Sequence, residues 1–374
     1  MEQKLKLRPL KKFGPGYFIQ EQMEDRKWTQ EDLAEIMGLT IKHVNHILQD
    51  KQSISLETAK MLAQIFETSP EYWINLDTHY QLWLHQENSE KVMEAKIKGQ
   101  IFARMPISDM IQKGWLKPHS TAKELAKQVL KFWDWKSLDF KILDQHYLPY
   151  FTKKSEAFNQ FNASYAITWY RKATMEAEKF NVKEYDKKKL TQLFHNIHQY
   201  TTKENGLNEF IQELNKVGVI FFVLPHLQKT YLDGAAFLHN NNPVIIYTAR
   251  YKRIDNFWFT VAHEIAHVLL HLNKKTPFVL DNFKDQEVNA MEEEANAMAS
   301  EMLKQHEIVE YLSPYSNYLT VSKVEECAST YNIHPALVVG TLAHEGQISY
   351  SNQNRYRENV LDLIKGKYKV GGCL

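Results

Sequence analysis

The sequence has few cysteines, no long hydrophobic run and almost no net charge, and each shortage excludes a class of protein. Its two cysteines, Cys327 and Cys373, are far apart, which argues against a disulfide framework and for a reducing cytosol. The best apolar run, residues 217–224, has the length of a strand and is too short for a membrane span. The first residues contain no apolar signal-peptide core, so we expect a cytoplasmic protein without a membrane partner.

Charge and length set two further limits. Lysine and arginine number 46 against 45 aspartates and glutamates, so no global basic field exists and any nucleic-acid site must be local. The length of 374 residues indicates two or three domains. Aromatic residues make up 12% of the chain, which favours a folded protein over a disordered one.

The stretch 260–271, TVAHEIAHVLLH, contains the pattern HExxH. On a helix His263 and His267 lie on one face, where both can bind one zinc ion, and Glu264 beside them can act as a general base. The surrounding residues are apolar on nearly every side, so the helix should be buried, and buried ionisable groups need a partner such as a metal. A chance match and a metal-free pair of core histidines are the alternatives.

A catalytic zinc usually keeps three protein ligands and one open position, so a third ligand is needed. Residues 291–303 form the candidate second helix, because small and apolar residues recur there at helical spacing: Ala295, Met298, Ala299 and Met302. Glu292 is the predicted third ligand, and Asn296, one turn later, is predicted to orient a ligating histidine. The alternative is that residues 292–294 are a solvated acidic first turn.

These two segments resemble the ImmA/IrrE family of zinc metallopeptidases, whose pattern is HExxH, a spacer, and then Glu-x-x-Ala-Asn/Asp. The resemblance implies that His263, His267 and Glu292 bind zinc (Zn²⁺) and that Glu264 is the general base, with Glu294 as the reserve ligand. It extends to residues 217–219, 234–236, 243–246 and 258–260. It departs at residues 302–305, where family members often have a Leu-Ile/Met-Pro ending. Candidate oxyanion stabilisers are Tyr231, Tyr247 and His271, each with a structural role as the alternative.

The N-terminal part is predicted to form several short helices joined by short turns. Thr29 and Asp32 form a capping box before a helix at 30–37, Gly38 ends that helix, and Thr40 can cap the next one at 41–48. Further helices are expected at 17–25, 55–66 and 70–76. In the 41–48 helix, inward positions are assigned to Ile41, Val44, Ile47 and Leu48.

Two short helices joined by a glycine-containing turn make a helix-turn-helix motif, whose second helix can enter the major groove. A plain helical bundle is the alternative. Side chains suited to phosphates and base edges make the predicted DNA contacts: Gln30, Thr40, Lys42, His43, Asn45 and His46. Residues 28–34, 45–48, 56–63 and 70–76 resemble the HigA type of Xre helix-turn-helix antitoxin or repressor. The resemblance implies a homodimer on a palindromic double-stranded operator, and a cognate toxin as a possible class of partner.

The predicted fold is mainly α with a small antiparallel sheet, an α+β class. It has a λ-repressor-like five-helix domain at residues 1–83, a helical linker segment at 84–160, a zincin-like metallopeptidase domain at 161–345 and a tail at 346–374. Strands are expected at 217–224, 235–239 and 243–247, and helices at 163–177, 323–331 and 334–342. The aromatic clusters 132–135 and 147–151 are expected in the core, with a ligand pocket as the alternative.

The sequence therefore predicts a bacterial, cytoplasmic and nucleoid-associated DNA-binding regulator that carries a zinc-dependent endopeptidase acting on a protein partner. One alternative is an antitoxin or autorepressor whose metal domain is a non-catalytic sensor or partner-binding module. A metal-free interaction scaffold is disfavoured because the complete metal set is present: His263, Glu264, His267 and Glu292.

Overall fold

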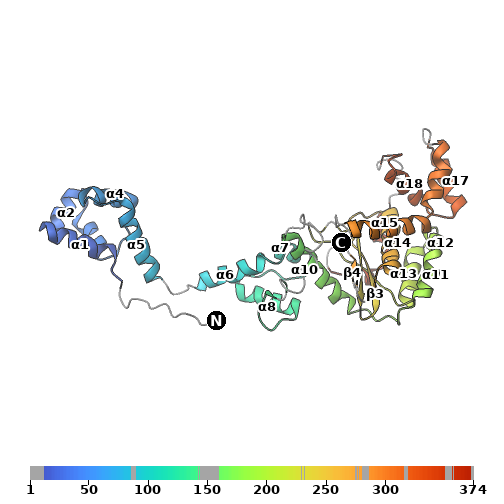
Figure 1. Cartoon of the computed structure of the whole chain (residues 1–374), viewed down its shortest axis with the longest axis horizontal. Helices are drawn as coiled ribbons and strands as arrows, with labels where there is room; N and C mark the ends of the chain where they lie inside the picture. Colours follow the sequence, from blue (N-terminus) through green and yellow to red (C-terminus); the bar gives the residue numbers. More distant parts are fainter. Residues whose placement is uncertain are drawn as a thin grey trace. The chain divides into compact units, whose positions relative to one another are not determined.

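The computed structural model describes residues 12–85, 90–141, 143, 160–228, 230, 232–273, 276, 278–279, 286–315, 319–349, 356 and 358–371. The chain divides into two compact units, residues 1–96 and 97–374 (Figure 1). It is mostly helical with one small sheet, which confirms the α+β class. Within the described ranges, no helix has both the length and the apolar composition that a membrane crossing requires.

The first unit is built from α1 (Pro15–Arg26), α2 (Gln30–Met37), α3 (Ile41–Leu48), α4 (Leu56–Ile65) and α5 (Pro70–Leu84), while α6 (Glu90–Phe102) crosses the boundary between the units. Their apolar faces meet in one core, whose most buried members include Ile19, Leu33, Val44, Leu62 and Trp73. The last helix continues to Leu84 and does not end at residue 76 as predicted.

Local side-chain chemistry fixes the ends of α2 and α3 where the sequence places them. The Thr29 hydroxyl accepts from the Asp32 amide at 3.1 Å, and the Asp32 carboxylate accepts from the Thr29 amide at 2.7 Å. Gly38 ends α2 with a φ of 65°, which glycine adopts without strain. Thr40 caps α3 by accepting from the His43 amide. One inward assignment was wrong, because Ile41 lies at the first turn of α3 with 49% of its surface exposed.

The second unit contains a four-stranded sheet in the order β1-β3-β2-β4, with β1 (Ile220–Val223), β2 (Gly234–His239), β3 (Asn242–Tyr247) and β4 (Phe278–Val279). The strands β2 and β3 are antiparallel because residues 240 and 241, both with positive φ, join them in a tight turn. The strand β1 pairs with β3 in parallel, so the sheet is mixed and not purely antiparallel as predicted. The connection from β1 to β3 runs from residue 224 to residue 241 and includes β2, which is long enough for two strands to pair in parallel.

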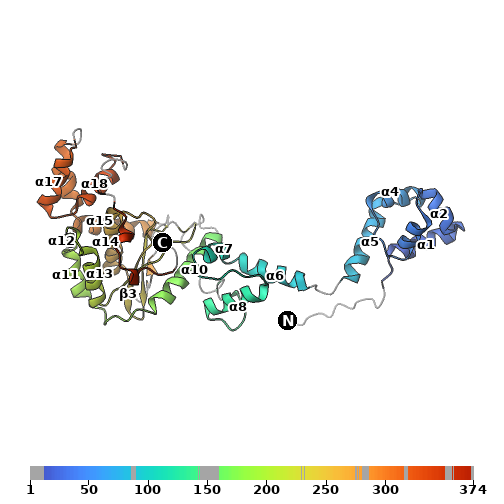
Figure 2. The ribbon, with the colours of Figure 1, turned by 180° about the vertical axis from the view of Figure 1, so that it is seen from behind.

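Helices cover both faces of this sheet (Figures 1 and 2). On one face Phe221 and Ile245 share a core with α13 (Gly206–Lys216) and α14 (Ile254–Leu270). On the other, Phe222 and Ile246 pack with α7 (Ile107–Gln112), α8 (Ala122–Trp133) and α10 (Gln160–Ala177). The segment expected to be a linker therefore contributes a layer of this unit.

The remaining elements surround α14 or complete the unit. They are α11 (Lys187–His195), α12 (His198–Thr201), α15 (Gln286–Met302), α16 (Gln305–Leu312), η2 (Ser313–Tyr315), α17 (Val321–Tyr331), α18 (Pro335–His344), α19 (Val360–Leu363) and η4 (Gly366–Tyr368). Phe132 and Trp133 are buried, as predicted for the first aromatic cluster, whereas the cluster 147–151 lies outside the described residues.

The last described residues run along the free side of β1. Tyr368 is buried against Phe221, with ring centroids 6.4 Å apart. Lys369 forms a parallel bridge with Val223, and the Val370 amide donates to the Val223 carbonyl at 3.0 Å. These contacts attach the segment to the outer strand of the sheet.

Candidate functional site

The buried helix α14 holds both histidines of the HExxH pattern between the sheet and α15. His263 is 6% exposed and His267 is fully buried. Their Nε2 atoms face each other at 2.9 Å. From α15, the Glu292 carboxylate reaches both rings, 3.2 Å from His263 Nε2 and 3.4 Å from His267 Nε2. Two segments far apart in the sequence thus bring two imidazoles and a carboxylate to one point.

This group fits a zinc ion in chemistry and in size. Tetrahedral zinc with bonds of about 2.0–2.1 Å separates its ligand atoms by about 3.3 Å. The two Nε2 atoms are 2.9 Å apart, and each lies near a different oxygen of Glu292, at 3.2 and 3.4 Å; one atom from each of the three residues can be chosen so that all lie within 4.8 Å of one another. Two nitrogens and one oxygen are also a ligand set that zinc prefers.

The negative charge of the Glu292 carboxylate favours the binding of a cation between the two histidines. Burial raises the pKa of its carboxyl group, but hydrogen bonds with His263 and His267 outweigh burial and lower the pKa to about 2. The group is therefore ionised at neutral pH, and it can share a cation with the two imidazoles once their Nε2 protons are lost.

The ring nitrogen of His267 that faces away from His263, Nδ1, is held by a chain of two contacts. This atom lies 3.0 Å from His271 Nδ1, and His271 Nε2 lies 3.0 Å from a carboxylate oxygen of Glu294. The carboxylate of the predicted reserve ligand thus contacts His271, outside the group of three. The structure leaves Asn296 exposed and gives it no hydrogen bond to either ring within the described part of the chain. Spacing alone could not reveal the role of His271, because it depends on where α15 crosses α14.

Glu264, the predicted general base, is fully buried next to the beginning of β2. Gly234 makes room for it: a methyl group there would lie 2.3 Å from the Glu264 carboxylate and 2.6 Å from Thr260. No real Cβ atom tolerates such a distance. This glycine lies within the family resemblance at residues 234–236 but was given no role from the sequence, because its importance comes from the packing of α14 on β2.

The candidate oxyanion groups occupy different places. Tyr247 is buried, and its hydroxyl donates to the Tyr251 carbonyl and also lies 3.1 Å from the Asn256 amide oxygen. Burial raises its pKa, with Asp255 contributing in the same direction. These contacts anchor the beginning of α14. His271 contacts His267 and Glu294, and Tyr231 lies outside the described residues.

The predicted DNA contacts gather around α3 in the first unit. Thr40 and Lys42 are exposed, and His43, Asn45 and His46 are half-buried. The Asn45 amide donates to Gln30 at 3.1 Å, and His43 lies 2.9 Å from Gln52, a residue that the sequence did not suggest. Exposed Ile41 was also missed, because helical spacing suggested that it was core. An apolar side chain there suits a thymine methyl group.

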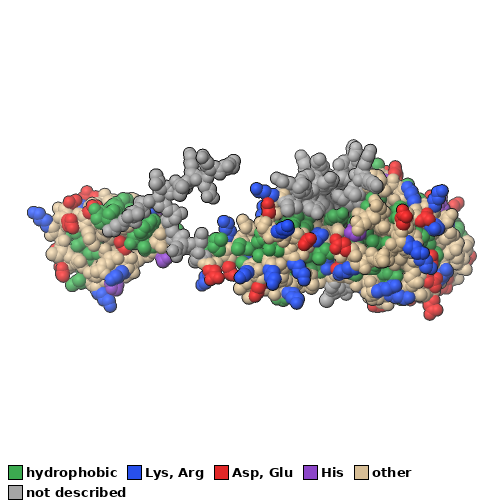
Figure 3. Space-filling model, turned by 90° about the horizontal axis from the view of Figure 1, so that it is seen from below, with side chains coloured by type: hydrophobic (Ala, Val, Ile, Leu, Met, Phe, Trp, Pro, Cys, Tyr) green, Lys and Arg blue, Asp and Glu red, His purple; other side chains and the backbone are tan. Residues whose placement is uncertain are grey.

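Charges of both signs are interspersed over the face of the larger unit seen in Figure 3. This agrees with the net charge of +1.

Comparisons with known proteins agree with these two sites. Residues 19–73 match the family described as Helix-turn-helix, and residues 218–342 match the IrrE N-terminal-like domain. An uncharacterized HTH-type transcriptional regulator of Haemophilus influenzae is 35% identical over 74 residues, which are 20% of this chain and 69% of the relative. A solved addiction module antidote protein of a HigA family from Coxiella burnetii is 30% identical, with a TM-score of 0.21, over 25% of this chain and 97% of that one.

The two sites and the two matches define a DNA-binding protein with an ImmA/IrrE-like domain that contains a possible His/Glu metal site. The chain belongs to the helix-turn-helix transcriptional regulators.

Proposed function

We propose that this regulator carries a zinc-dependent endopeptidase that hydrolyses a protein partner or another regulator. The observation that supports it most is the convergence of His263, His267 and Glu292, with Glu264 buried and next to His263 in the sequence. The three would hold the zinc ion, which supplies a Lewis acid for a peptide carbonyl and makes water more acidic. A group of this composition has little structural purpose without a metal.

The protein side chains have distinct tasks in this proposal. Glu264 takes a proton from the attacking water and passes it to the leaving amine. Gly234 keeps the space that its carboxylate occupies. His271 and Glu294 hold the ring of His267 in the orientation that points Nε2 at the metal. Asn296 was predicted to orient a ligating histidine. It is exposed on α15, so it could take that role only if α15 rotated.

The same proposal assigns the first unit to operator binding as a homodimer. The predicted contacts from α2 and α3 would read base edges and phosphates, while dimer symmetry would match a palindromic site. A mobility-shift assay with Lys42→Ala and Asn45→Ala tests this assignment. Lys42→Ala should weaken binding to every sequence, and Asn45→Ala should act mainly on the specific operator. Unchanged affinity in both variants would remove α3 from the interface.

Zinc content and one substitution test the peptidase. Wild type should purify with one equivalent of zinc per chain, and Glu292→Ala should lose most of it. Glu264→Gln should retain the zinc and abolish every proteolysis-dependent phenotype. If that phenotype persists, the metal domain is a non-catalytic sensor or partner-binding module of an antitoxin or autorepressor, with a cognate toxin as a candidate partner. If wild type binds no zinc, the metal site itself is refuted.

A further inference from the structure

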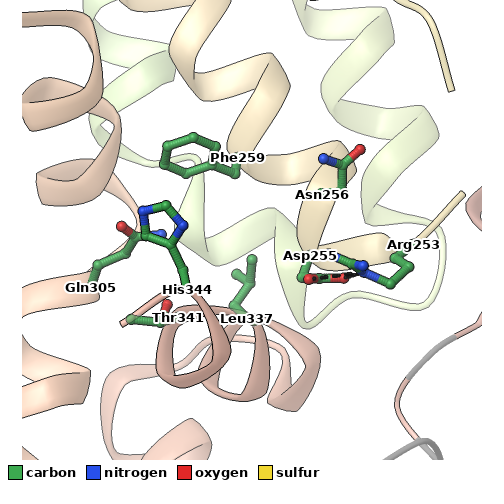
Figure 4. A pocket seen from close by; sticks show the side chains of 9 residues that line it. Arg253, Asp255, Asn256, Phe259, Gln305, Leu337, Thr341 and His344 are labelled. Atoms are coloured by element: carbon green, nitrogen blue, oxygen red, sulfur yellow. Dashed lines mark hydrogen bonds and ion pairs between the residues drawn. The ribbon is translucent and has the colours of Figure 1, made fainter. Parts of the chain in front are cut away.

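A small pocket opens beside the first turns of α14, next to the candidate metal centre (Figure 4). Phe259 forms the wall that the two share. Its ring lies 6.2 Å from the ring of His263 on one side and 6.4 Å from that of His344 on the other, measured between centroids. Since Phe259 precedes His263 by one helical turn, about 6 Å of helix rise separates this wall of the pocket from a candidate ligand.

The pocket has the size of one side chain. Its volume is about 100 Å³. A water molecule occupies about 30 Å³ of the liquid, so the space holds roughly three waters. Gly340 of α18 helps to create it by allowing a close approach to α14, because a methyl group there would lie 2.7 Å from Asp255. The pocket therefore has room for a single amino-acid side chain.

The full charges in the lining cancel each other. Arg253 Nε lies 3.0 and 3.3 Å from the two carboxylate oxygens of Asp255. A charged side chain that entered the pocket would lose its hydration and find no unpaired opposite charge in Arg253 or Asp255. Such a transfer is unfavourable. This argues for an uncharged guest.

The other polar groups of the lining each donate and accept hydrogen bonds. Asn256, Gln305, Thr341 and His344 come from three helices or their ends, and Figure 4 shows Gln305 and His344 side by side. The Asn256 amide oxygen already lies 3.1 Å from the Tyr247 hydroxyl, and the Gln305 amide oxygen accepts from the Ser300 hydroxyl at 2.8 Å, so both amides offer the pocket their NH₂ groups. An aliphatic guest would remove these groups from water without replacing their hydrogen bonds. A guest satisfies them if it accepts from the two NH₂ groups and also has a donor for Thr341 or His344. Phe259 and Leu337 leave an apolar path for a short stem.

We propose that this pocket binds a glutamine or asparagine side chain of an extended protein substrate, an inference that depends on the peptidase function proposed above. A carboxamide is uncharged, donates and accepts, and is carried on a short apolar stem. An extended peptide advances about 3.3 Å per residue, and the shared wall lies about 6 Å of helix rise from His263, so we expect the bound side chain about two residues from the cleaved bond.

Cleavage profiling provides the first test. The zinc-loaded full chain is incubated with a synthetic library of random peptides, and the cleaved bonds are identified by mass spectrometry. Wild type should enrich glutamine or asparagine at one position within two residues of the cleaved bond. Gln305→Leu should reduce that enrichment about tenfold, the effect of one lost hydrogen bond. Gln192→Leu makes the same change at an exposed position of α11 and should leave the enrichment unchanged.

A binding test separates the pocket from the peptidase. The full-length Glu264→Gln variant is titrated with N-acetyl-glutamine amide while the ring signals of His344, identified by their loss in His344→Gln, are followed by NMR. N-acetyl-norleucine amide and the matching glutamate and lysine amides are the controls. Only the glutamine probe should shift these signals saturably, and Leu337→Trp, which fills the space, should abolish the shift.

The outcomes distinguish the two hypotheses. Binding of the glutamine probe without any cleavage by wild type supports the pocket and refutes the peptidase. Cleavage without glutamine or asparagine enrichment, together with no selective shift, overturns the pocket assignment and leaves the peptidase intact. Absence of both cleavage and binding overturns both.

Discussion

Replacement of Gly234 by alanine tests whether β2 positions the candidate general base. The added methyl group would lie 2.3 Å from the Glu264 carboxylate, whereas an ordinary contact begins at 3.4 Å. One of the two groups must therefore retreat by about 1 Å, the difference between those distances. Neither side is a flexible surface chain, because Glu264 is fully buried and Gly234 belongs to a central part of the sheet.

Two effects of known size should follow. Overpacking a buried site typically costs about 1–3 kcal/mol. The opening free energy of α14 and β2 should fall by that amount, so their amide hydrogens should exchange faster. A displacement of about 1 Å at a reacting group can lower a rate by about 100-fold. Hydrogen exchange of the full chain, followed by mass spectrometry, measures the first effect, and peptide hydrolysis at equal zinc content measures the second.

Two comparisons make this test specific. Gly366→Ala is the matched control, since a methyl group there meets nothing within 4 Å. Glu264→Asp withdraws the carboxylate by about one carbon–carbon bond, roughly 1.5 Å. The double variant should therefore lose less stability than the sum of the single variants. Equal exchange in Gly234→Ala and Gly366→Ala, or strict additivity in the double variant, would contradict the proposed contact.

Three further predictions concern other parts of the second unit. His271→Phe should weaken zinc binding about 10–100-fold in a chelator competition, because it removes the partner of His267 Nδ1; unchanged affinity would exclude that role. In a Cys373→Ser background the Cys327 thiol should react with iodoacetamide only when the unit unfolds, since burial raises its pKa to about 11; rapid labelling of the native protein would be inconsistent with this. Burial raises the pKa of Glu176, but hydrogen bonds from two lysines outweigh it and lower the pKa below the usual value of 4.5. Its stabilising effect is thus present above about pH 4.5 and lost as the pH falls through the folded pKa, so acid unfolding should be less steep in Glu176→Gln.

Features set by neighbouring residues were the most predictable from the sequence. Thr29, Gly38 and Thr40 act through the backbone within a few positions, and α2 and α3 have the predicted bounds as a result. Ile41 is the instructive exception. Its spacing matches the core residues of α3, but it occupies the first turn, where 49% of its surface stays exposed.

Features that depend on distant packing were harder to predict. Glu292 was predicted as a ligand from the need for a third one and from the helical pattern of residues 291–303, and its spacing to the histidines resembles that of a known family. The parallel pairing of β1 with β3 and the short β4 follow from the route of the connections and not from local composition. The contact of Glu294 with His271, in place of one from Asn296, is set by the angle at which α15 crosses α14.

The attachment of residues 369 and 370 to Val223 has a practical consequence. An open strand edge is a template on which a second molecule can add its own strand. In the described part of the chain, β1 is an outer strand of four apolar residues, and the segment that follows η4 occupies its hydrogen-bonding edge. Shortening the protein to residue 365 would expose the hydrogen-bonding edge of β1, which could pair with the same edge of a second molecule. Such a truncated protein should form oligomers or precipitate as its concentration rises.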